Sequence, residues 1–121
     1  KSINDRFGHA AGDDVLRALA NLLGDCLPPS QVSGRLGGDE FAVLLPMDAA
    51  AAGKAAERLR AAAEACELPA HPGLKFSLSI GLAAPSPGTD LRAWLEAADQ
   101  ALYRAKEAGR NRTATAALAM D

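Results

Sequence analysis

The sequence predicts one α+β domain in which a mainly antiparallel central sheet is flanked by helices. Two observations carry this prediction. Helical stripes of apolar residues are interspersed along the chain with short strand-like runs, and a Gly-Gly pair joins two of these runs as a hairpin. The length of 121 residues suits a single domain, and no repeat or low-complexity linker divides it. We therefore treat residues 1–121 as one unit.

The first predicted helix covers residues 13–27, where apolar side chains recur at helical spacing. Asp13 and Asp14 stand at its expected start, where the helix dipole favours carboxylates. Two strands follow, one around Gln31–Arg35 and one over Phe41–Leu45. Because glycine supplies the positive φ of a tight turn, the glycine pair between them predicts a hairpin.

An alanine-rich helix is predicted over residues 48–67, with Asp48 as its N-cap and Leu59 on its buried side. Apolar and polar side chains then alternate from Leu74 to Ala83. This period of two predicts a half-buried strand.

The last predicted helix is capped by Thr89 or Asp90 and runs to Ala108. It carries Trp94 at helical spacing with several leucines, which predicts core packing for the indole. A final short strand is expected within residues 111–117.

Composition narrows the class of protein. Hydrophobic residues make up 49% and charged residues 23%, as in soluble globular domains. A net charge of −2 and a pI near 5.6 exclude a broad basic surface, so we expect no nucleic-acid polymer as partner. No apolar run has the length of a membrane helix, so this domain is expected to make no direct membrane contact. Cys26 and Cys66 form no CxxC motif and indicate small buried hydrophobes in a reducing, cytoplasmic compartment; the parent protein could still be membrane-tethered.

A first candidate site lies at the hairpin turn. Gly37 and Gly38 allow a ligand to approach the backbone, and the carboxylates of Asp39 and Glu40 suit a hard cation. The same four residues also describe an ordinary turn between two strands.

Two further patterns have both a functional and a structural interpretation. Asn4, His9 and Asp13 present groups that suit a purine base edge, yet they also suit turns, a surface position and a helix cap. Lys106 and Arg110 are four residues apart, so they share one helix face and can grip a phosphate, or they can simply complement the helix dipole. The sequence contains no Walker loop and no GxGxxG motif, which excludes two common nucleotide-binding folds.

Together these patterns resemble the GGDEF domain of diguanylate cyclases, named for the stretch that stands here as Gly37-Gly38-Asp39-Glu40-Phe41. The similarity continues in the family's order through Lys1-Ser2-Ile3-Asn4-Asp5, Phe7-Gly8-His9, Gly12-Asp13, Arg35-Leu36, Ser79-Ile80-Gly81, residues 98–106 and Gly109-Arg110-Asn111-Arg112. Because it spans essentially the whole chain, the sequence is identified as a member of this family.

The resemblance implies a fold similar to the nucleotidyl cyclase and polymerase palm. It implies the metal-dependent condensation of two GTP into cyclic di-GMP with release of pyrophosphate, in a homodimer and with Mg²⁺ or Mn²⁺. The implied substrate-binding residues are Asn4, His9, Asp13, Gly37, Gly38, Lys106 and Arg110. Asp39 is implied as metal ligand and proton acceptor, and Glu40 as the second acidic group of the metal site.

Two departures from the family pattern lead to expectations of their own. The family has a central first strand with a metal-binding Asp in a D-x-D-x-F-K pattern, and its lysine corresponds to Lys1. We therefore expect a domain truncated at its N-terminus, and low activity for residues 1–121 alone. Pro28-Pro29-Ser30-Gln31 replace the family's product-binding R-x-x-D, so strong feedback is not expected, although Arg58 remains a possible product-binding residue. The alternative function is a non-catalytic GGDEF module that binds GTP or cyclic di-GMP and regulates a partner.

Overall fold

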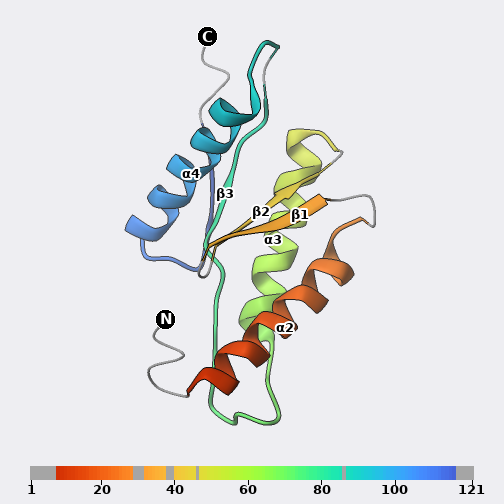
Figure 1. Cartoon of the computed structure of the whole chain (residues 1–121), viewed down its shortest axis with the longest axis vertical. Helices are drawn as coiled ribbons and strands as arrows, with labels where there is room; N and C mark the ends of the chain where they lie inside the picture. Colours follow the sequence, from red (N-terminus) through yellow and green to blue (C-terminus); the bar gives the residue numbers. More distant parts are fainter. Residues whose placement is uncertain (1–7, 29–31, 38–39, 46, 86, 117–121) are drawn as a thin grey trace.

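The structure is a computed structural model that describes residues 8–28, 32–37, 40–45, 47–85 and 87–116. Its elements in chain order are α2 (His9–Cys26), β1 (Val32–Gly37), β2 (Glu40–Leu44), α3 (Ala49–Ala65), β3 (Ile80–Leu82), α4 (Leu91–Glu107) and β4 (Thr113–Thr115). Figure 1 shows their arrangement.

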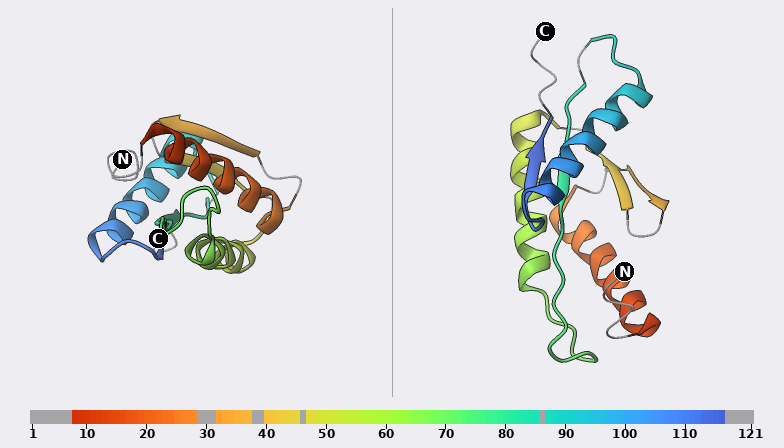
Figure 2. Two further views of the ribbon diagram at one scale, coloured as in Figure 1. Left: turned by 90° about the horizontal axis from the view of Figure 1, so that it is seen from below. Right: turned by 90° about the vertical axis from the view of Figure 1, so that its left-hand side faces the viewer.

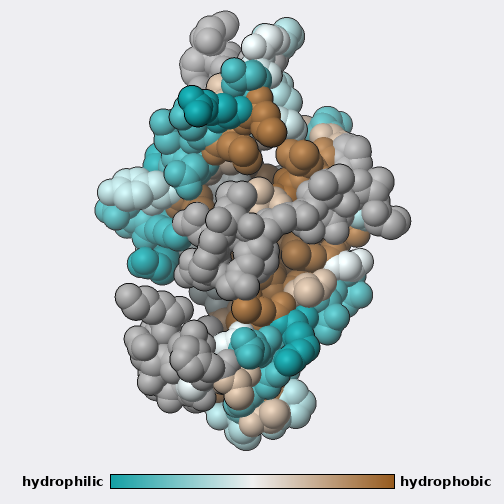
Figure 3. All heavy atoms as spheres, in the orientation of Figure 1, coloured by the Kyte–Doolittle hydropathy of each residue, from teal (hydrophilic) through white to brown (hydrophobic). Residues whose placement is uncertain are grey.

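The strands β3 and β4 lie between α3 and α4, and both helices contact both strands (Figure 2). The helix α2 packs on α3. The hairpin β1–β2 lies on the opposite side of the molecule from α3 (Figure 2). On the face seen in Figure 3, hydrophobic residues gather in the middle, while hydrophilic residues cover the outer sides of α4 and α2. No helix of the described residues is long and apolar enough to cross a membrane.

The strand pairing corrects the prediction of a mainly antiparallel central sheet. Among the described residues, β1 and β2 pair antiparallel from Val32↔Leu44 to Gly37↔Glu40, which confirms the hairpin. The strands β3 and β4, however, pair parallel from Ile80↔Thr113 to Leu82↔Thr115 and form a separate sheet. The parallel pair was missed because α4 connects the two strands as a crossover, and the sequence pattern of each strand is the same for either direction.

The predicted strand from Leu74 to Ala83 is also shorter in the structure, where, among the described residues, only Ile80–Leu82 of this segment pairs with another strand. The alternation itself is confirmed, because Leu74 and Phe76 are buried while Lys75 and Ser77 are exposed. These apolar side chains enter a core cluster with Ala11 and Ala63 from α2 and α3. Within the described part of the chain, the period of two therefore reports one buried face of this segment, and strand pairing is limited to Ile80–Leu82.

The start of α2 differs from the prediction as well. The helix begins at His9, with Gly8 at the N-cap in a left-handed conformation (φ 89°) and no side-chain cap. Asp13 and Asp14 therefore lie in the second turn, so their predicted place at the helix start and the interpretation of Asp13 as a helix cap are wrong. A glycine cap carries no side-chain signal, which is why the sequence pattern placed the start too late.

The other helix caps are confirmed. The Asp48 carboxylate accepts a hydrogen bond from the Ala51 N–H at 2.8 Å, and the Asp90 carboxylate accepts one from the Ala93 N–H at 2.8 Å. Each bond satisfies one of the free backbone donors of a first helical turn. The predicted burial of Leu59 on α3 is confirmed too, with 8% exposure.

Small residues form the contact between α4 and β3. The buried residues of α4 are Ala97, Ala101 and Ala105. Opposite them, a Cβ built on Gly81 would lie 2.2 Å from the Ala98 carbonyl oxygen and 2.3 Å from the Leu102 nitrogen. Strand and helix backbones therefore touch directly, and this contact fixes the distance between α4 and the sheet.

The large apolar side chains of α4 lie mostly outside the buried core. Leu91 is 57% exposed and Leu95 is 36% exposed. Trp94 is half-buried, and its indole N–H donates to the Ala83 carbonyl at 2.7 Å. Core packing of the indole is thus only partly confirmed, because close backbone contact leaves no room for large side chains on the buried face. Cys26 and Cys66 are half-buried free thiols.

Candidate functional site

The hairpin turn places the first candidate group. Gly37 is the last residue of β1 and pairs with Glu40, the first residue of β2, beyond an irregularity in register after Arg35. Gly38 and Asp39 lie outside the described residues, so the predicted metal site at Asp39 and Glu40 stays a prediction. Within the described part of the chain, no group of three or more His, Cys, Asp or Glu side chains comes together as a metal site.

The second candidate group stands at the start of α2. Asn4 lies outside the described residues, and His9 is the first residue of the helix. Asp13 is exposed one turn further along. Its carboxylate has no capping role, so it is available to a ligand. Its neighbour Asp14 is bound instead, because it accepts a hydrogen bond from His71 Nε2 at 2.7 Å.

The third candidate group is at the C-terminal end of α4. Lys106 lies in the last turn and is half-buried, whereas Arg110 lies exposed in the turn that follows, with φ 63°. The prediction that the two cations share one helix face is therefore wrong, because the helix ends at Glu107 and the backbone becomes left-handed from Gly109 on. The first turn of α2 and the last turn of α4 both lie toward the left side of Figure 1. A cation in this last turn complements the helix dipole and can equally bind a phosphate, so the position of Lys106 agrees with both interpretations.

The turn that carries Arg110 is bound to α3 through Asn111. The Asn111 amide oxygen accepts from Arg60 Nη1 at 2.9 Å, and its amide nitrogen donates to Glu64 Oε2 at 2.9 Å. The Asn111 backbone N–H donates to Ser79 Oγ at 3.2 Å. The side-chain oxygen, the side-chain nitrogen and the backbone N–H of Asn111 are thus each hydrogen-bonded to a residue far away in sequence.

The same network sets the electrostatics of the region. Hydrogen bonds from Arg60 lower the pKa of Glu57, and those from Asn111 and Arg60 lower the pKa of Glu64. The two carboxylates in turn raise the pKa of Arg60. All three groups are therefore charged across the neutral range.

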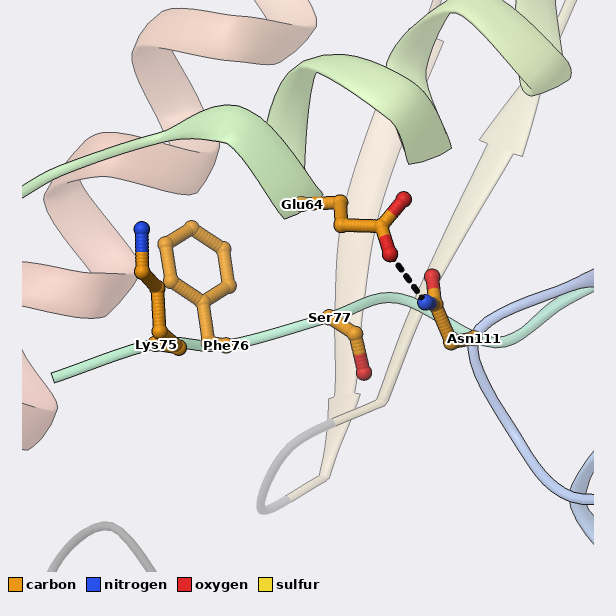
Figure 4. Close-up of a pocket in the computed structure, with 5 residues that line it drawn as sticks. All are labelled: Glu64, Lys75, Phe76, Ser77 and Asn111. Atoms are coloured by element: carbon orange, nitrogen blue, oxygen red, sulfur yellow. Dashed lines mark hydrogen bonds between the residues drawn. The ribbon is translucent and has the colours of Figure 1, made fainter.

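A shallow pocket of ≈ 400 Å³ lies beside this network and is lined by Glu64, Lys75, Phe76, Ser77 and Asn111. Figure 4 shows the Asn111 amide directed at the Glu64 carboxylate, to which it is hydrogen-bonded. Two of its polar groups, the Glu64 carboxylate and the Asn111 amide, are thus bound to each other.

The possible product-binding residue Arg58 is exposed on α3, and its Nη2 donates to the Cys26 carbonyl at 3.3 Å. The contact binds the end of α2 to α3. The R-x-x-D equivalents from Pro29 to Gln31 lie outside the described residues.

A comparison with family models finds a match to "Diguanylate cyclase, GGDEF domain" over residues 1–112. The chain belongs to the GGDEF-domain family. The predicted resemblance is thereby confirmed.

Named relatives and solved structures agree with this membership. The chain is 44% identical over 119 residues to the probable diguanylate cyclase DgcC of Escherichia coli K12, covering 97% of this chain and 32% of the relative. It is 47% identical over 116 residues to the diguanylate cyclase DgcP of Pseudomonas aeruginosa, covering 93% and 17%. The structure superposes on the GGDEF domain of DgcB from Caulobacter crescentus in complex with c-di-GMP with a TM-score of 0.81 at 32% identity, covering 94% of this chain and 70% of that one.

The chain therefore spans a third or less of the length of these curated relatives. Its fold is that of a GGDEF domain, as the solved structure shows.

Sequence patterns missed the anchoring role of Asn111, Arg60 and Glu64. Asn111 stood in the family motif, but Arg60 is 51 residues and Glu64 is 47 residues away in sequence. The only available signal was the i, i+4 spacing of Arg60 and Glu64 on one helix, which is typical of any surface ion pair.

Proposed function

We propose that this GGDEF domain is the catalytic part of a diguanylate cyclase, which condenses two GTP molecules into cyclic di-GMP with release of pyrophosphate. The observation that carries the proposal is the family match over residues 1–112, together with relatives that are named diguanylate cyclases. The likeness to a GGDEF domain in complex with c-di-GMP supports the same product chemistry.

In the proposed reaction, the 3′-hydroxyl oxygen of each GTP bonds to the α-phosphorus of the other, and the bond from that phosphorus to pyrophosphate breaks. The hydroxyl proton passes to the carboxylate of Asp39. Since one domain holds one GTP, two copies must face each other, and we propose a homodimer as the active form.

Asp39 and Glu40 would hold a divalent cation, Mg²⁺ or Mn²⁺. Two adjacent carboxylates at a strand start are an oxygen donor set that fits a hard cation. When bound, such an ion neutralises charge on the phosphates and favours displacement of pyrophosphate. The backbone at Gly37 and Gly38 would lie against these phosphates, since neither residue has a side chain to obstruct them.

The guanine base would be bound by Asn4 and Asp13, with His9 as a further contact to the nucleotide. An asparagine donates and accepts, and a carboxylate accepts from two nitrogens, as the guanine edge requires. The exposed position of Asp13 in the second turn of α2 supports this role, because the helix does not use the carboxylate as a cap.

Lys106 and Arg110 would bind the terminal phosphates. Lys106 stands in the last turn of α4 and Arg110 in the turn that follows, and two cations match the charge that phosphoryl transfer must neutralise. For Arg58 we propose at most a weak contribution to product binding, because the usual R-x-x-D pair is absent. Micromolar product inhibition that Arg58→Ala abolishes would contradict this.

The test is chromatographic detection of cyclic di-GMP after incubation with GTP and Mg²⁺. The protein carries an added N-terminal strand with the family's D-x-D-x-F-K pattern ending in Lys1, so that both proposed metal-binding segments are present. Asp39→Ala is the test variant. Asp25→Ala is its matched control, since Asp25 is exposed near the far end of α2.

Product from the parent and from Asp25→Ala, but not from Asp39→Ala, supports the cyclase proposal. Absence of product from a folded protein whose melting temperature GTP still raises would assign the domain to the regulatory binding modules instead. Absence of both product and ligand stabilisation overturns both functions.

A further inference from the structure

The turn after α4 has an uncommon backbone. Three consecutive residues have positive φ: Gly109 at 126°, Arg110 at 63° and Asn111 at 49°. Glycine adopts this conformation readily, but residues with a Cβ seldom do. Such a turn persists only where its surroundings hold it in place.

Asn111 provides that hold. Its amide oxygen accepts from Arg60 at 2.9 Å, its amide nitrogen donates to Glu64 at 2.9 Å, and its backbone N–H donates to Ser79 Oγ at 3.2 Å. Figure 4 shows the amide directed at the Glu64 carboxylate. These three bonds fasten the turn to α3 and to the segment that leads into β3.

The α3 side of this clamp is itself fixed. Arg60 Nε donates to the Glu57 carboxylate at 3.1 Å, and Arg60 Nη1 donates to Glu64 at 3.1 Å. The Arg60 side chain is only 16% exposed. Its charge is thus satisfied by two carboxylates and an amide, and Arg60 serves to hold Asn111 and not to bind an external anion.

Arg110 is held by its main chain while its side chain stays exposed. Its N–H donates to the Ala105 carbonyl at 3.0 Å, and its carbonyl accepts from Arg112 Nε at 3.1 Å. Across the part of the chain that the structure describes, all the bonds of Arg110 are of this main-chain kind. The turn therefore fixes the backbone of Arg110, while its guanidinium group remains exposed and can bind a ligand.

We propose that Asn111, clamped by Arg60 and Glu64, is a positioning residue for the phosphate end of a nucleoside triphosphate. It acts through Arg110, by holding the left-handed turn that aims this arginine. The proposal rests on the proposed function, because it takes Arg110 as a ligand of the terminal phosphates. Geometry is decisive here, since a displacement of about 1 Å in a positioned group can cost about a hundredfold in rate.

The test compares two ligands that differ only in the phosphates concerned. Affinities for GTP and GMP, with Mg²⁺, are measured by titration calorimetry on the 121-residue chain and on its N-terminally extended form. Asn111→Ala should weaken GTP binding about tenfold and GMP binding by less than about twofold. A general loosening of the fold would weaken both ligands alike and leave the ratio unchanged.

Two further variants separate the amide from the backbone and from nearby packing. Asn111→Gly permits the same positive φ but lacks the amide, so it should lose as much GTP affinity as Asn111→Ala. The matched control is Arg104→Ala, because Arg104 Nη2 donates to the Thr115 carbonyl at 3.1 Å and joins α4 to β4 without touching the turn. This control should leave the GTP to GMP ratio unchanged.

A double-mutant cycle decides whether Asn111 acts through Arg110. Once Arg110→Ala has removed the guanidinium, adding Asn111→Ala should change GTP affinity by less than about twofold. The proposal is overturned if the fold loss of GTP affinity in the double variant equals the product of the losses in the two single variants. It is also overturned if Arg104→Ala loses as much GTP affinity as Asn111→Ala.

The outcomes also separate this inference from the function on which it rests. If Arg110→Ala weakens GTP binding and Asn111→Ala does not, the positioning role is wrong and the phosphate site stands. If GTP does not bind, or binds equally well without Arg110, then the proposed phosphate site fails and the inference fails with it.

Discussion

Gly81→Ala should be among the most damaging single substitutions in this domain. The added Cβ would lie 2.2 Å from the Ala98 oxygen, 2.3 Å from the Leu102 nitrogen and 2.8 Å from the Leu102 Cα. Ordinary non-bonded contacts between carbon atoms are about 3.5–4.0 Å, so α4 must move away from β3 by roughly 1 Å. All three obstructing atoms belong to the helix backbone, which cannot yield by a change of rotamer.

Overpacking of this kind costs about 1–3 kcal/mol, and a clash with backbone on this scale belongs at the upper end. For a domain of this length, about 4 °C of melting temperature corresponds to 1 kcal/mol, so the expected fall is about 12 °C. GTP affinity should also decrease, because the displaced helix carries Lys106, a proposed ligand of the terminal phosphates.

The assay is thermal unfolding followed by circular dichroism, with Gly53→Ala as the matched control. Gly53 lies inside α3, and a Cβ there meets no atom within 4 Å. This change should stabilise the domain by about 0.5–1 kcal/mol, because alanine loses less backbone entropy in a helix. A melting temperature for Gly81→Ala within about 3 °C of the parent would refute the argument from close backbone contact.

Three other changes test separate features. Asp48→Ala removes the N-cap of α3 and should cost about 1 kcal/mol by urea unfolding, while Asp48→Asn should retain most of it. Trp94→Phe removes the indole hydrogen bond and should cost about 1 kcal/mol in the same assay; an unchanged midpoint would show that water replaces it. The lowered pKa values of Glu57 and Glu64 predict that their contribution to stability is present above the ordinary value of 4.5 and lost as the pH falls below it. A protein with both changed to Gln should show a smaller loss of melting temperature on acidification, and an equal loss would exclude the Arg60 network as its source.

Local sequence patterns predicted most helices and strands correctly, but they did not predict how the strands pair. Asp48 marked the start of α3 correctly because a cap is a contact between residues three apart. The start of α2 was missed because Gly8 caps it with backbone geometry alone. The segment from Leu74 was assigned to a strand because alternation reports burial, whereas strand pairing depends on a partner that no local pattern specifies.

In the candidate site, too, single residues could be predicted from the sequence, whereas long-range contacts could not. Asp13, Lys106 and Arg110 became candidates from residue type, from helical spacing and from the family resemblance. The clamp between Asn111 and Arg60 could not be anticipated, because their 51-residue separation is closed only by the packing of α3 against the β3–β4 pair.

The parallel pairing of β3 and β4 across α4 also has a consequence for the order in which the domain opens. These elements form a continuous unit from Ile80 to Thr115, joined by strand pairing and by the backbone contact at Gly81. Cooperative units of this kind exchange their amide hydrogens last. We expect the amides of β3 and β4 to outlast those of the hairpin β1–β2, so a nucleotide bound at the proposed phosphate site after α4 would be held by a unit that opens later than the hairpin.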